Sequence, residues 1–278
     1  MNTKKLLSLA LALTMGLSLT ACGGGSAPSA TPAASAGSAE TAAASDLAYV
    51  RDKGVLVVGI TEFEPMDYQD KDGNWIGFDA DMARAFADSL GVTCEFQIID
   101  WDNKVMELDG KTIDAVWNGM TLTAEVTSAM SCSNAYCNNA QVVIVPAARA
   151  AEYQSVDSVK ELAFAVESGS AGQAEVAALG ASYTEVQDQA TALLEVSSGT
   201  ADAAVIDSLM AAAMVGEGTS YADLTYTVGL NSEEYGVGFR KGSDLAEALN
   251  DFLKAAYADG SLLETAETYG VQAALIAQ

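Results

Sequence analysis

The chain has 278 residues, with 13 basic and 38 acidic side chains, a formal net charge of −25 and no histidine. The lack of histidine excludes a Ser-His-Asp triad, a Cys-His nucleophile pair and a histidine-ligated zinc site, and the charge argues against a basic face for nucleic acid or anionic lipid. Half of the residues are apolar and only 18% are charged, which is typical of a chain that folds.

The N-terminal segment has the layout of an export signal. Lys4 and Lys5 precede an uncharged apolar run over residues 6–19, which is short for a membrane span. The run leads into Leu-Thr-Ala-Cys22, which resembles the bacterial lipobox, where a cysteine receives the lipid and becomes the mature N-terminus. We therefore expect residues 1–21 to be a signal peptide and Cys22 to be lipidated. The alternative is a plain signal peptide with an incidental cysteine.

Residues 22–45 consist almost entirely of Gly, Ser, Ala, Thr and Pro. Such a composition cannot bury a core and predicts a flexible tether. Residues 46–278 remain for the folded part, which is long enough for two lobes. No other stretch is long and apolar enough to span a bilayer. We expect an exported protein that its lipid anchors to the membrane.

Strand and helix patterns alternate in the first half of the folded part. Short runs rich in β-branched residues predict buried strands. Apolar residues at i, i+4 and i+8 from Phe78 predict a helix that ends at Gly91. This alternation is typical of βαβ units and a largely parallel sheet. In chain order we expect a strand over 55–60, the helix from Phe78, a strand over 93–99, a short helix over 102–108 and a strand over 113–117.

The same alternation recurs in the second half, so two similar α/β lobes are favoured over one large sheet. The segment Gly110-Lys-Thr-Ile-Asp-Ala-Val resembles Gly199-Thr-Ala-Asp-Ala-Ala-Val, and both connect a predicted helix to a predicted strand. The expected elements are strands over 163–167, 182–186 and 203–206, helices over 171–179 and 188–197, and two closing helices over 243–258 and 262–269.

Candidate ligand-binding residues follow the strands, because open α/β sheets bind ligands beyond the carboxyl ends of their strands. These positions hold two aromatic side chains, small hydroxyl and amide groups, a glycine-rich helix start and an acid. That inventory suits a small polar organic ligand with an apolar part and lacks the groups of a catalyst. The segments are 61–65, 100–102, 118–121, 168–171 and 207–208.

Several of these residues also fit a purely structural role. Gly169-Ser-Ala-Gly172 opens a helix whose N–H groups can seat an anion, although an ordinary helix start has the same pattern. Asp207 can pair with a ligand ammonium group or cap the helix that follows it. Phe63 and Trp101 can stack on a ligand or pack in the core, and residue type alone favours the core.

Three further cysteines follow Cys22, namely Cys94, Cys132 and Cys137. Export permits disulfides, and Cys132 and Cys137 are close enough in sequence to bridge, but free thiols are the default expectation. No group of cysteines or carboxylates has the spacing of a metal site, so neither a metal nor a cofactor is expected.

Together these segments resemble the extracellular solute-binding proteins of ABC importers, in the family that binds polar amino acids. The resemblance covers about residues 46–278, and its signal is the order and spacing of the motifs. The motifs are Glu62-Phe63-Glu-Pro65-Met, Gly73-Asn-Trp-Ile-Gly77-Phe78-Asp79, Asp100-Trp101-Asp102, Ile113-Asp114-Ala-Val-Trp-Asn118-Gly119-Met-Thr121-Leu-Thr123, Ser133-Asn-Ala-Tyr136, Glu167-Ser-Gly169-Ser, Asp202-Ala-Ala-Val-Ile-Asp207 and Glu234-Tyr235-Gly236-Val.

The resemblance implies a periplasmic-binding-protein-like α/β fold, with two lobes joined by two hinge segments and a ligand cleft between the lobes. The hinge segments fall near residues 136–140 and 231–235. Lobe one is then 46–138 plus 234–278, and lobe two is 139–233.

The resemblance also implies roles for individual residues. Two aromatic side chains sandwich the ligand, an acid holds its α-ammonium group, and small residues hold its α-carboxylate. The expected ligand-binding set is Phe63 and Trp101 as the aromatics, Asp207 as the acid, Gly119, Thr121, Ser170 and Ala171 around the carboxylate, and Asn118 and Glu167 as further members.

One position departs from the family pattern. Val126 stands where the family has an arginine that clamps the α-carboxylate. The acids Asp207, Glu167 and Glu62 fall at the predicted cleft, with no cation predicted beside them. A second ligand carboxylate would be repelled in such a site. We therefore expect a zwitterionic or cationic ligand and not an acidic amino acid.

These features predict a substrate-binding lipoprotein of an amino-acid ABC transporter rather than an enzyme. We expect a monomer that captures a polar amino acid, cationic ones included, or a related amine, and delivers it to the membrane permease. It would face the outside of the cell membrane, or the periplasm in a cell with an outer membrane. The alternatives are a ligand-sensing lipoprotein and an enzyme on the same fold, such as a lyase of cyclic acids.

Overall fold

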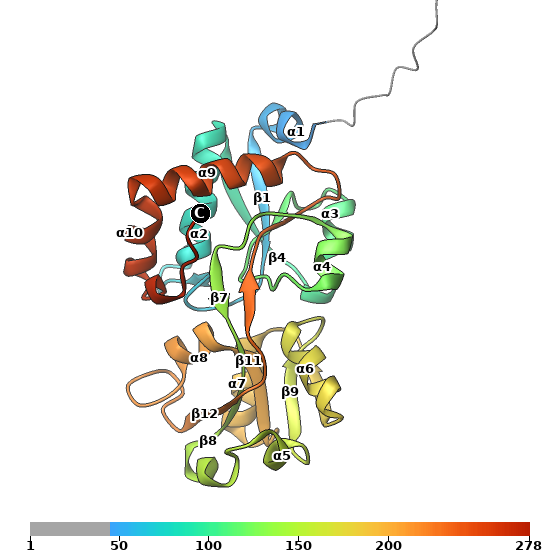
Figure 1. Ribbon diagram of the computed structural model, residues 1–278, viewed down its shortest axis with the longest axis vertical. Coiled ribbons are helices and arrows are strands. Elements are labelled where there is room, and N and C mark those ends of the chain that lie inside the picture. Colours follow the sequence, from blue (N-terminus) through green and yellow to red (C-terminus); the bar gives the residue numbers. More distant parts are fainter. Residues whose placement is uncertain (1–44) are drawn as a thin grey trace, which may run out of the picture. The chain divides into compact units, whose positions relative to one another are not determined.

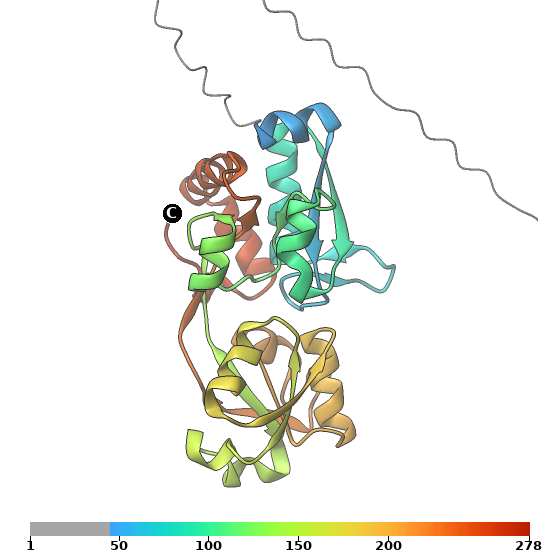
Figure 2. The same cartoon turned by 90° about the vertical axis from the view of Figure 1, so that its right-hand side faces the viewer.

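The computed structural model describes residues 45–278, which form two α/β lobes with a five-stranded sheet in each (Figure 1). The expected signal peptide, the lipidated Cys22 and nearly all of the expected tether lie outside the described residues. Two short antiparallel strands, β7 (Cys137–Asn139) and β13 (Glu233–Tyr235), connect the lobes. Figure 2 shows both connecting segments on the same side of the molecule. The two-lobed α/β fold predicted from the sequence is confirmed.

The sheet of lobe one is built around β1, whose sequence Val-Leu-Val-Val-Gly-Ile suits a buried parallel strand. β1 pairs in parallel with β4 on one side and β5 on the other. β14 pairs antiparallel with both β5 and β6. The strands, in sheet order, are β4 (Thr93–Ile98), β1 (Val55–Ile60), β5 (Ala115–Val116), β14 (Gly238–Phe239) and β6 (Ser131–Cys132).

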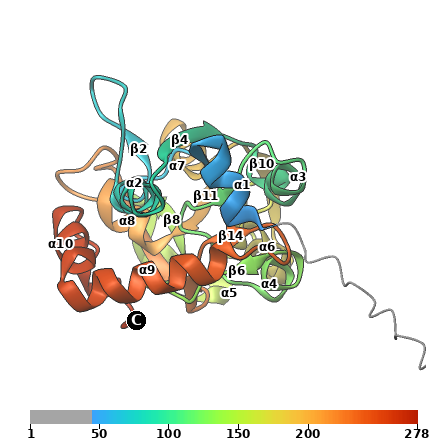
Figure 3. The ribbon, with the colours of Figure 1, turned by 90° about the horizontal axis from the view of Figure 1, so that it is seen from above.

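Helices pack around this sheet. α2 (Phe78–Leu90) buries the apolar side chains at i, i+4 and i+8 from Phe78, and Gly91 ends the helix in the left-handed conformation, as predicted. α9 (Leu245–Asp259) and α10 (Ser261–Thr268) lie along one side of the lobe (Figure 3). The other elements of lobe one are α1 (Asp46–Lys53), β2 (Tyr68–Gln69), β3 (Trp75–Ile76), the 3-10 turn η1 (Trp101–Asn103), α3 (Lys104–Asp109), α4 (Ala124–Ala129) and the 3-10 turn η3 (Gln272–Ala274).

Lobe two repeats the arrangement. β9 pairs in parallel with β10 and β11, while β8 pairs antiparallel with β11 and β12. The strands, in sheet order, are β10 (Ser182–Val186), β9 (Ala163–Glu167), β11 (Ala203–Asp207), β8 (Gln141–Pro146) and β12 (Leu224–Gly229). The helices are η2 (Ala147–Glu152), α5 (Val156–Val159), α6 (Ala171–Leu179), α7 (Gln189–Ser198) and α8 (Ser208–Met214).

In each sheet, a single strand runs against the other four. These strands are β8 and β14, and each directly follows a connecting strand, β7 or β13. A strand that enters from the connection starts at the edge where the parallel strands end, so it must run in the opposite direction. The carboxyl ends of the parallel strands of both lobes therefore meet at the cleft, which is where ligands bind in such sheets.

Candidate functional site

Eight of the nine predicted ligand-binding residues line one cavity between the lobes, although they are far apart in the sequence. The cavity leaves about 20 Å³ for the centres of water-sized molecules, which is room for about one water. Whether these residues contact a ligand stays a prediction. The lining residues are Trp101, Asn118, Gly119, Thr121, Glu167, Ser170, Ala171 and Asp207, together with Gln189. We call this space the acid cavity.

Phe63 is the predicted member that does not line the acid cavity. Its side chain is 2% exposed and packs edge to face on Tyr235, with ring centroids 6.4 Å apart. Gly119 lies in front of it, with a φ of +54°, and a Cβ at this position would come within 2.5 Å of the Phe63 ring. Phe63 thus supports the loop that carries Gly119, and its role in stacking on a ligand remains a prediction.

Asp207, the last residue of β11, is held by uncharged groups. Its carboxylate accepts hydrogen bonds from the hydroxyl of Tyr235 at 2.6 Å, from Nε2 of Gln141 at 3.0 Å, and from the side-chain amides of Asn139 and Gln189. Asp207 precedes α8, but its side chain makes no capping hydrogen bond to that helix. Burial, followed by the charge of Glu233, raises the pKa of Asp207 to about 7.

Glu167 ends the neighbouring strand β9 and faces the acid cavity. The residue is 2% exposed, and its Oε1 has no hydrogen-bond partner among the described residues. Burial, followed by the negative charge of Asp207, raises the pKa of Glu167 to about 8. A buried carboxyl oxygen without a donor is costly, so the position favours a proton or a donor group from a ligand.

Two buried carboxylates, of Asp67 and Asp79, accept hydrogen bonds from the loop that follows β5. Asn118 Oδ1 accepts from both N and Oγ1 of Thr61, and its Nδ2 donates to Asp67 at 2.8 Å. Asp79 Oδ2 accepts from Gly119 N at 2.7 Å and also from a tyrosine hydroxyl at 2.7 Å. The amide of Asn118 is therefore engaged by the protein, and its main role here is to position the loop.

The start of α6 forms the opposite wall of the cavity. Ser170 is the N-cap, and its Oγ accepts from Gln173 N at 3.0 Å. The N–H groups of Ala171 and Gly172, in the first turn, have no acceptor within the helix. Gly169 has a φ of +72°, and a Cβ there would lie 2.7 Å from the Cα of Asp102 in lobe one. The two lobes are thus in close contact at this glycine.

A second cavity, of about 580 Å³, adjoins the acid cavity and shares Trp101, Thr121, Ser170 and Ala171 with it. Its other lining residues include Lys104 and Val126, and we call it the lysine cavity. Sequence reasoning placed no cation near the acids, and this was wrong, because Lys104 lies at the same cleft. Its position three residues after Trp101, at the start of a helix, was the signal that could have found it.

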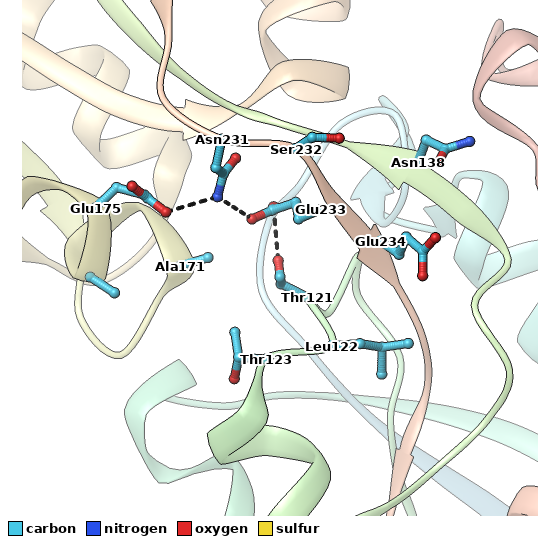
Figure 4. A pocket seen from close by; sticks show the side chains of 11 residues that line it. Thr121, Leu122, Thr123, Asn138, Ala171, Glu175, Asn231, Ser232, Glu233 and Glu234 are labelled. Atoms are coloured by element: carbon cyan, nitrogen blue, oxygen red, sulfur yellow. Dashed lines mark hydrogen bonds between the residues drawn. The ribbon is translucent and has the colours of Figure 1, made fainter. Parts of the chain in front are cut away.

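A third hollow, of about 440 Å³, lies beside the connecting strands (Figure 4). Its centre is Glu233, whose carboxylate accepts from Thr121 Oγ1 at 2.9 Å and from Asn231 Nδ2 at 2.9 Å. The amides of Asn139 and Gln141 each donate to Glu233 and also to Asp207. Sequence reasoning missed these amides and Gln189, because only the folded chain brings them to Asp207.

Arginine is absent from the lining of the cavities described between residues 45 and 278. Arg240 instead forms ion pairs with Asp46 and Asp114 at 2.9 and 3.2 Å. Asp114 precedes β5, at the end of the strand away from the cleft.

Cys94, Cys132 and Cys137 are free thiols. Within the described part, no cluster of three metal-ligating side chains occurs, and no helix has the length and apolar character to cross a membrane.

The fold and the cleft agree with the result of a comparison with protein families. Residues 56–272 match the model of the bacterial extracellular solute-binding proteins, family 3. The chain belongs to this family. A protein of Neisseria gonorrhoeae named "Probable histidine-binding protein" is 30% identical over 261 residues, which is 91% of each chain. The arginine-binding extracellular protein of Bacillus subtilis is 29% identical over 219 residues, covering 76% of this chain and 84% of that one.

Solved structures give the same result. The crystal structure of an ancestral amino acid-binding protein, a precursor of cyclohexadienyl dehydratase, aligns with a TM-score of 0.74 at 30% identity. The alignment covers 81% of this chain and 99% of the ancestral protein. These three relatives are named as amino-acid-binding proteins, and one of them is described as the precursor of an enzyme.

Proposed function

We propose that this protein captures a cationic or zwitterionic amino acid, or a related amine, between its two lobes and delivers it to an ABC permease. One observation carries the proposal: Glu167 and Asp207, both buried, face one cavity from lobe two, and Glu167 has an oxygen without a donor. A ligand ammonium or guanidinium group supplies both donors and positive charge. The relatives named for histidine and arginine support this ligand class.

Binding follows from the position of the cavity between the lobes. Trp101, Gly119 and Thr121 come from lobe one, and Glu167 and Asp207 come from lobe two. A ligand that contacts both walls binds more tightly when the lobes are together, so it shifts the hinge equilibrium to the closed form. The closed form then docks on the permease.

The experiment that tests the ligand class is a thermal-shift screen of the full chain carrying Cys22→Ser, with amino acids and polyamines. A ligand that binds only the folded state stabilises it by RT ln(1 + [L]/Kd), about 2.7 kcal/mol at 100 Kd. Arginine, lysine, histidine or a polyamine should raise the melting temperature. Glutamate and aspartate should not, and a large shift with either of them would contradict the proposal.

We also propose that Cys22 carries the lipid that anchors the protein outside the cell membrane. The lipobox-like sequence and the Gly/Ser/Ala-rich segment after it support this proposal. Cys22→Ser should release soluble, ligand-competent protein from the membrane fraction. Retention of the variant in that fraction would contradict the anchor.

A second candidate function is catalysis, and one observation favours it. The raised pKa of Glu167 keeps this carboxyl largely protonated at neutral pH, which suits a proton donor to a leaving group. The ancestral structural relative is the precursor of a dehydratase. Incubation with a panel of cyclic hydroxy acids separates the two functions. Turnover that Glu167→Gln abolishes would establish the enzyme, whereas binding without turnover supports the transport function.

A further inference from the structure

Lys104 places a positive charge at the cleft between the lobes. Its Nζ donates to the carbonyl oxygen of Trp101, in lobe one, at 3.1 Å and to that of Gly169, in lobe two, at 3.0 Å. The same Nζ lies 4.9 Å from the centre of the Trp101 ring. Lys104 is the one basic residue that lines the cavities of the cleft within residues 45–278.

This ammonium group has only neutral hydrogen-bond acceptors. None of the ion pairs among the described residues includes Lys104. The side chain is half-buried, and burial lowers its pKa, while the nearby Glu167 acts in the opposite direction. A half-buried charge without a counter-ion loses hydration that two carbonyl dipoles replace only in part. Two of its three N–H groups are used, and one remains for another acceptor.

The surroundings of Lys104 suit an anionic group of a ligand. Ser170 and Ala171, at the start of α6, line the lysine cavity, and the N–H groups of the first helical turn favour negative charge. The hydroxyl residues Thr121 and Thr123 lie in the same lining. The adjoining acid cavity holds Glu167, which is more than nine-tenths buried and has an oxygen without a donor. The ammonium group of Lys104 and the buried carboxyl groups of Glu167 and Asp207 therefore stand on two sides of adjoining cavities.

We propose that Lys104 binds the carboxylate of the ligand, while the cationic group of the same ligand faces Glu167 and Asp207. The inference rests on the proposed function and specifies it: the ligand is a dipolar amine that carries a carboxylate, and a simple polyamine is a poorer ligand. Val126, on α4, gives the lysine cavity an apolar wall where the family has an arginine. The positive charge of this cavity comes instead from Lys104, on α3. The ligand carboxylate accepts a hydrogen bond from the third N–H of Lys104, or it accepts the N–H that Lys104 otherwise donates to the Gly169 carbonyl.

Lys104 could instead serve only to hold the two lobes together through its two carbonyl partners. In that case its loss would weaken the binding of every ligand to the same extent. A role in carboxylate binding weakens only ligands that carry the carboxylate. The two roles are thus separated by pairs of compounds that differ in this group alone.

The test measures dissociation constants by calorimetry for arginine and agmatine, lysine and cadaverine, and histidine and histamine. The proteins are the full chain carrying Cys22→Ser, without further change and with Lys104→Met, Lys104→Arg or Lys241→Met. Lys241 is a matched control, because its Nζ also donates to two backbone carbonyls, of Thr127 and Met130, and it lines none of the described cavities. Thermal unfolding of each variant reports whether it folds.

We expect the protein with Lys104 to prefer the amino acid of at least one pair by about 10- to 100-fold, as for one charge-assisted hydrogen bond. Lys104→Met should remove this preference, and Lys241→Met and Lys104→Arg should keep it. A preference that survives Lys104→Met overturns the proposal, as does equal binding of both members before mutation, and the proposed function stands in either case. If no compound of any pair binds, the proposal for Lys104 fails, whereas the proposed function is decided by the thermal-shift screen with the wider set of amino acids and polyamines.

Discussion

The charge of Asp207 remains available to a ligand because its hydrogen-bond donors are uncharged. Tyr235, Gln141, Asn139 and Gln189 all donate to this carboxylate. Truncation to alanine would leave these buried donors unpaired, so Asp207→Asn is the better probe of the charge. We expect Asp207→Asn to weaken binding of a cationic ligand about 10- to 100-fold, measured by calorimetry.

The control for that measurement is an aspartate of the same lobe outside the cleft. Asp157 lies on α5, has a side chain that is 91% exposed and pairs with Lys160. Asp157→Asn should leave the affinity unchanged. Equal affinities for both variants and the parent protein would show that Asp207 only organises the hinge.

Val126 is a second position where charge can be tested. The side chain is 8% exposed, packs in a core cluster with Ile99 and Met120, and lines the lysine cavity of about 580 Å³. The cavity has room for an arginine, so Val126→Arg should strengthen binding of α-carboxylate ligands. The same variant should weaken binding of an amine without a carboxylate, because it adds an unpaired positive charge. Calorimetry with arginine and agmatine measures both effects, and weaker binding of arginine would contradict the expectation.

Most residues of the acid cavity could be predicted from the sequence because each follows a recognisable strand. Glu167 and Asp207 end apolar runs, and the carboxyl ends of such strands must meet at one edge. Gln189 and Gln141 could not be predicted in this way, because both are first residues of elements, α7 and β8, and reach Asp207 only through tertiary packing. Residue type alone favoured a core position for Phe63, but its contact with Gly119 could not be predicted, because that contact depends on how two loops pack.

At the scale of elements, two glycines flank α6 and allow a matched test of the contact between the lobes. Gly169 precedes the helix with a φ of +72°, and Gly180 ends it with a φ of +73°. A Cβ at Gly180 meets nothing within 4 Å, whereas a Cβ at Gly169 lies 2.7 Å from the Cα of Asp102. Both alanine variants should cost about 1 kcal/mol of stability from the left-handed backbone, seen in thermal unfolding.

Only Gly169→Ala should also weaken ligand binding, by about 10-fold or more, because its methyl group separates the lobes at the mouth of the cleft. Calorimetry of the two variants side by side measures this difference. Equal affinities in the two variants would show that the contact between Gly169 and Asp102 does not matter for binding.

The predicted βα alternation is confirmed in both lobes, because long β-branched runs and capped helices carry strong local signals. The connecting strands gave no such signal. β7 and β13 have the sequences Cys-Asn-Asn and Glu-Glu-Tyr, and β13 pairs with β7 rather than with either sheet. β5 spans only two residues, although its sequence suggested a strand of five. Short polar strands are set by their partners rather than by their composition.

At the scale of the whole molecule, the buried acids make stability depend on pH. Burial raises the pKa of Glu167 from 4.5 to about 8 and that of Asp207 from 3.8 to about 7. A carboxyl with a raised pKa binds its proton more tightly in the folded state. Its stabilising contribution is present below pH 4 and is lost as the pH rises through 7 and 8. The free energy of unfolding without ligand should therefore fall between pH 5 and pH 9.

Glu167→Gln should reduce this fall, because the amide does not ionise. One pKa unit corresponds to about 1.4 kcal/mol, so the shift of Glu167 sets an upper bound of about 5 kcal/mol on the difference. Urea unfolding at several pH values measures it, and Glu161→Gln, at an exposed position, is the control. A cationic ligand should bind more tightly as the pH rises, because Glu167 and Asp207 lose their protons and their negative charge then attracts the ligand. An identical pH profile in both variants would contradict this account.

The place of β14 in the sheet of lobe one has a consequence for the order in which the two lobes can fold. β14 lies between β5 and β6, and β6 is hydrogen-bonded to this sheet only through β14. All strands of the second sheet lie between residues 141 and 229, whereas β14 spans residues 238–239. Because the chain is synthesised from its N-terminus, lobe two has its complete sheet before lobe one does. Lobe one waits for β14, the last strand of the chain, although most of the residues of this lobe emerge first.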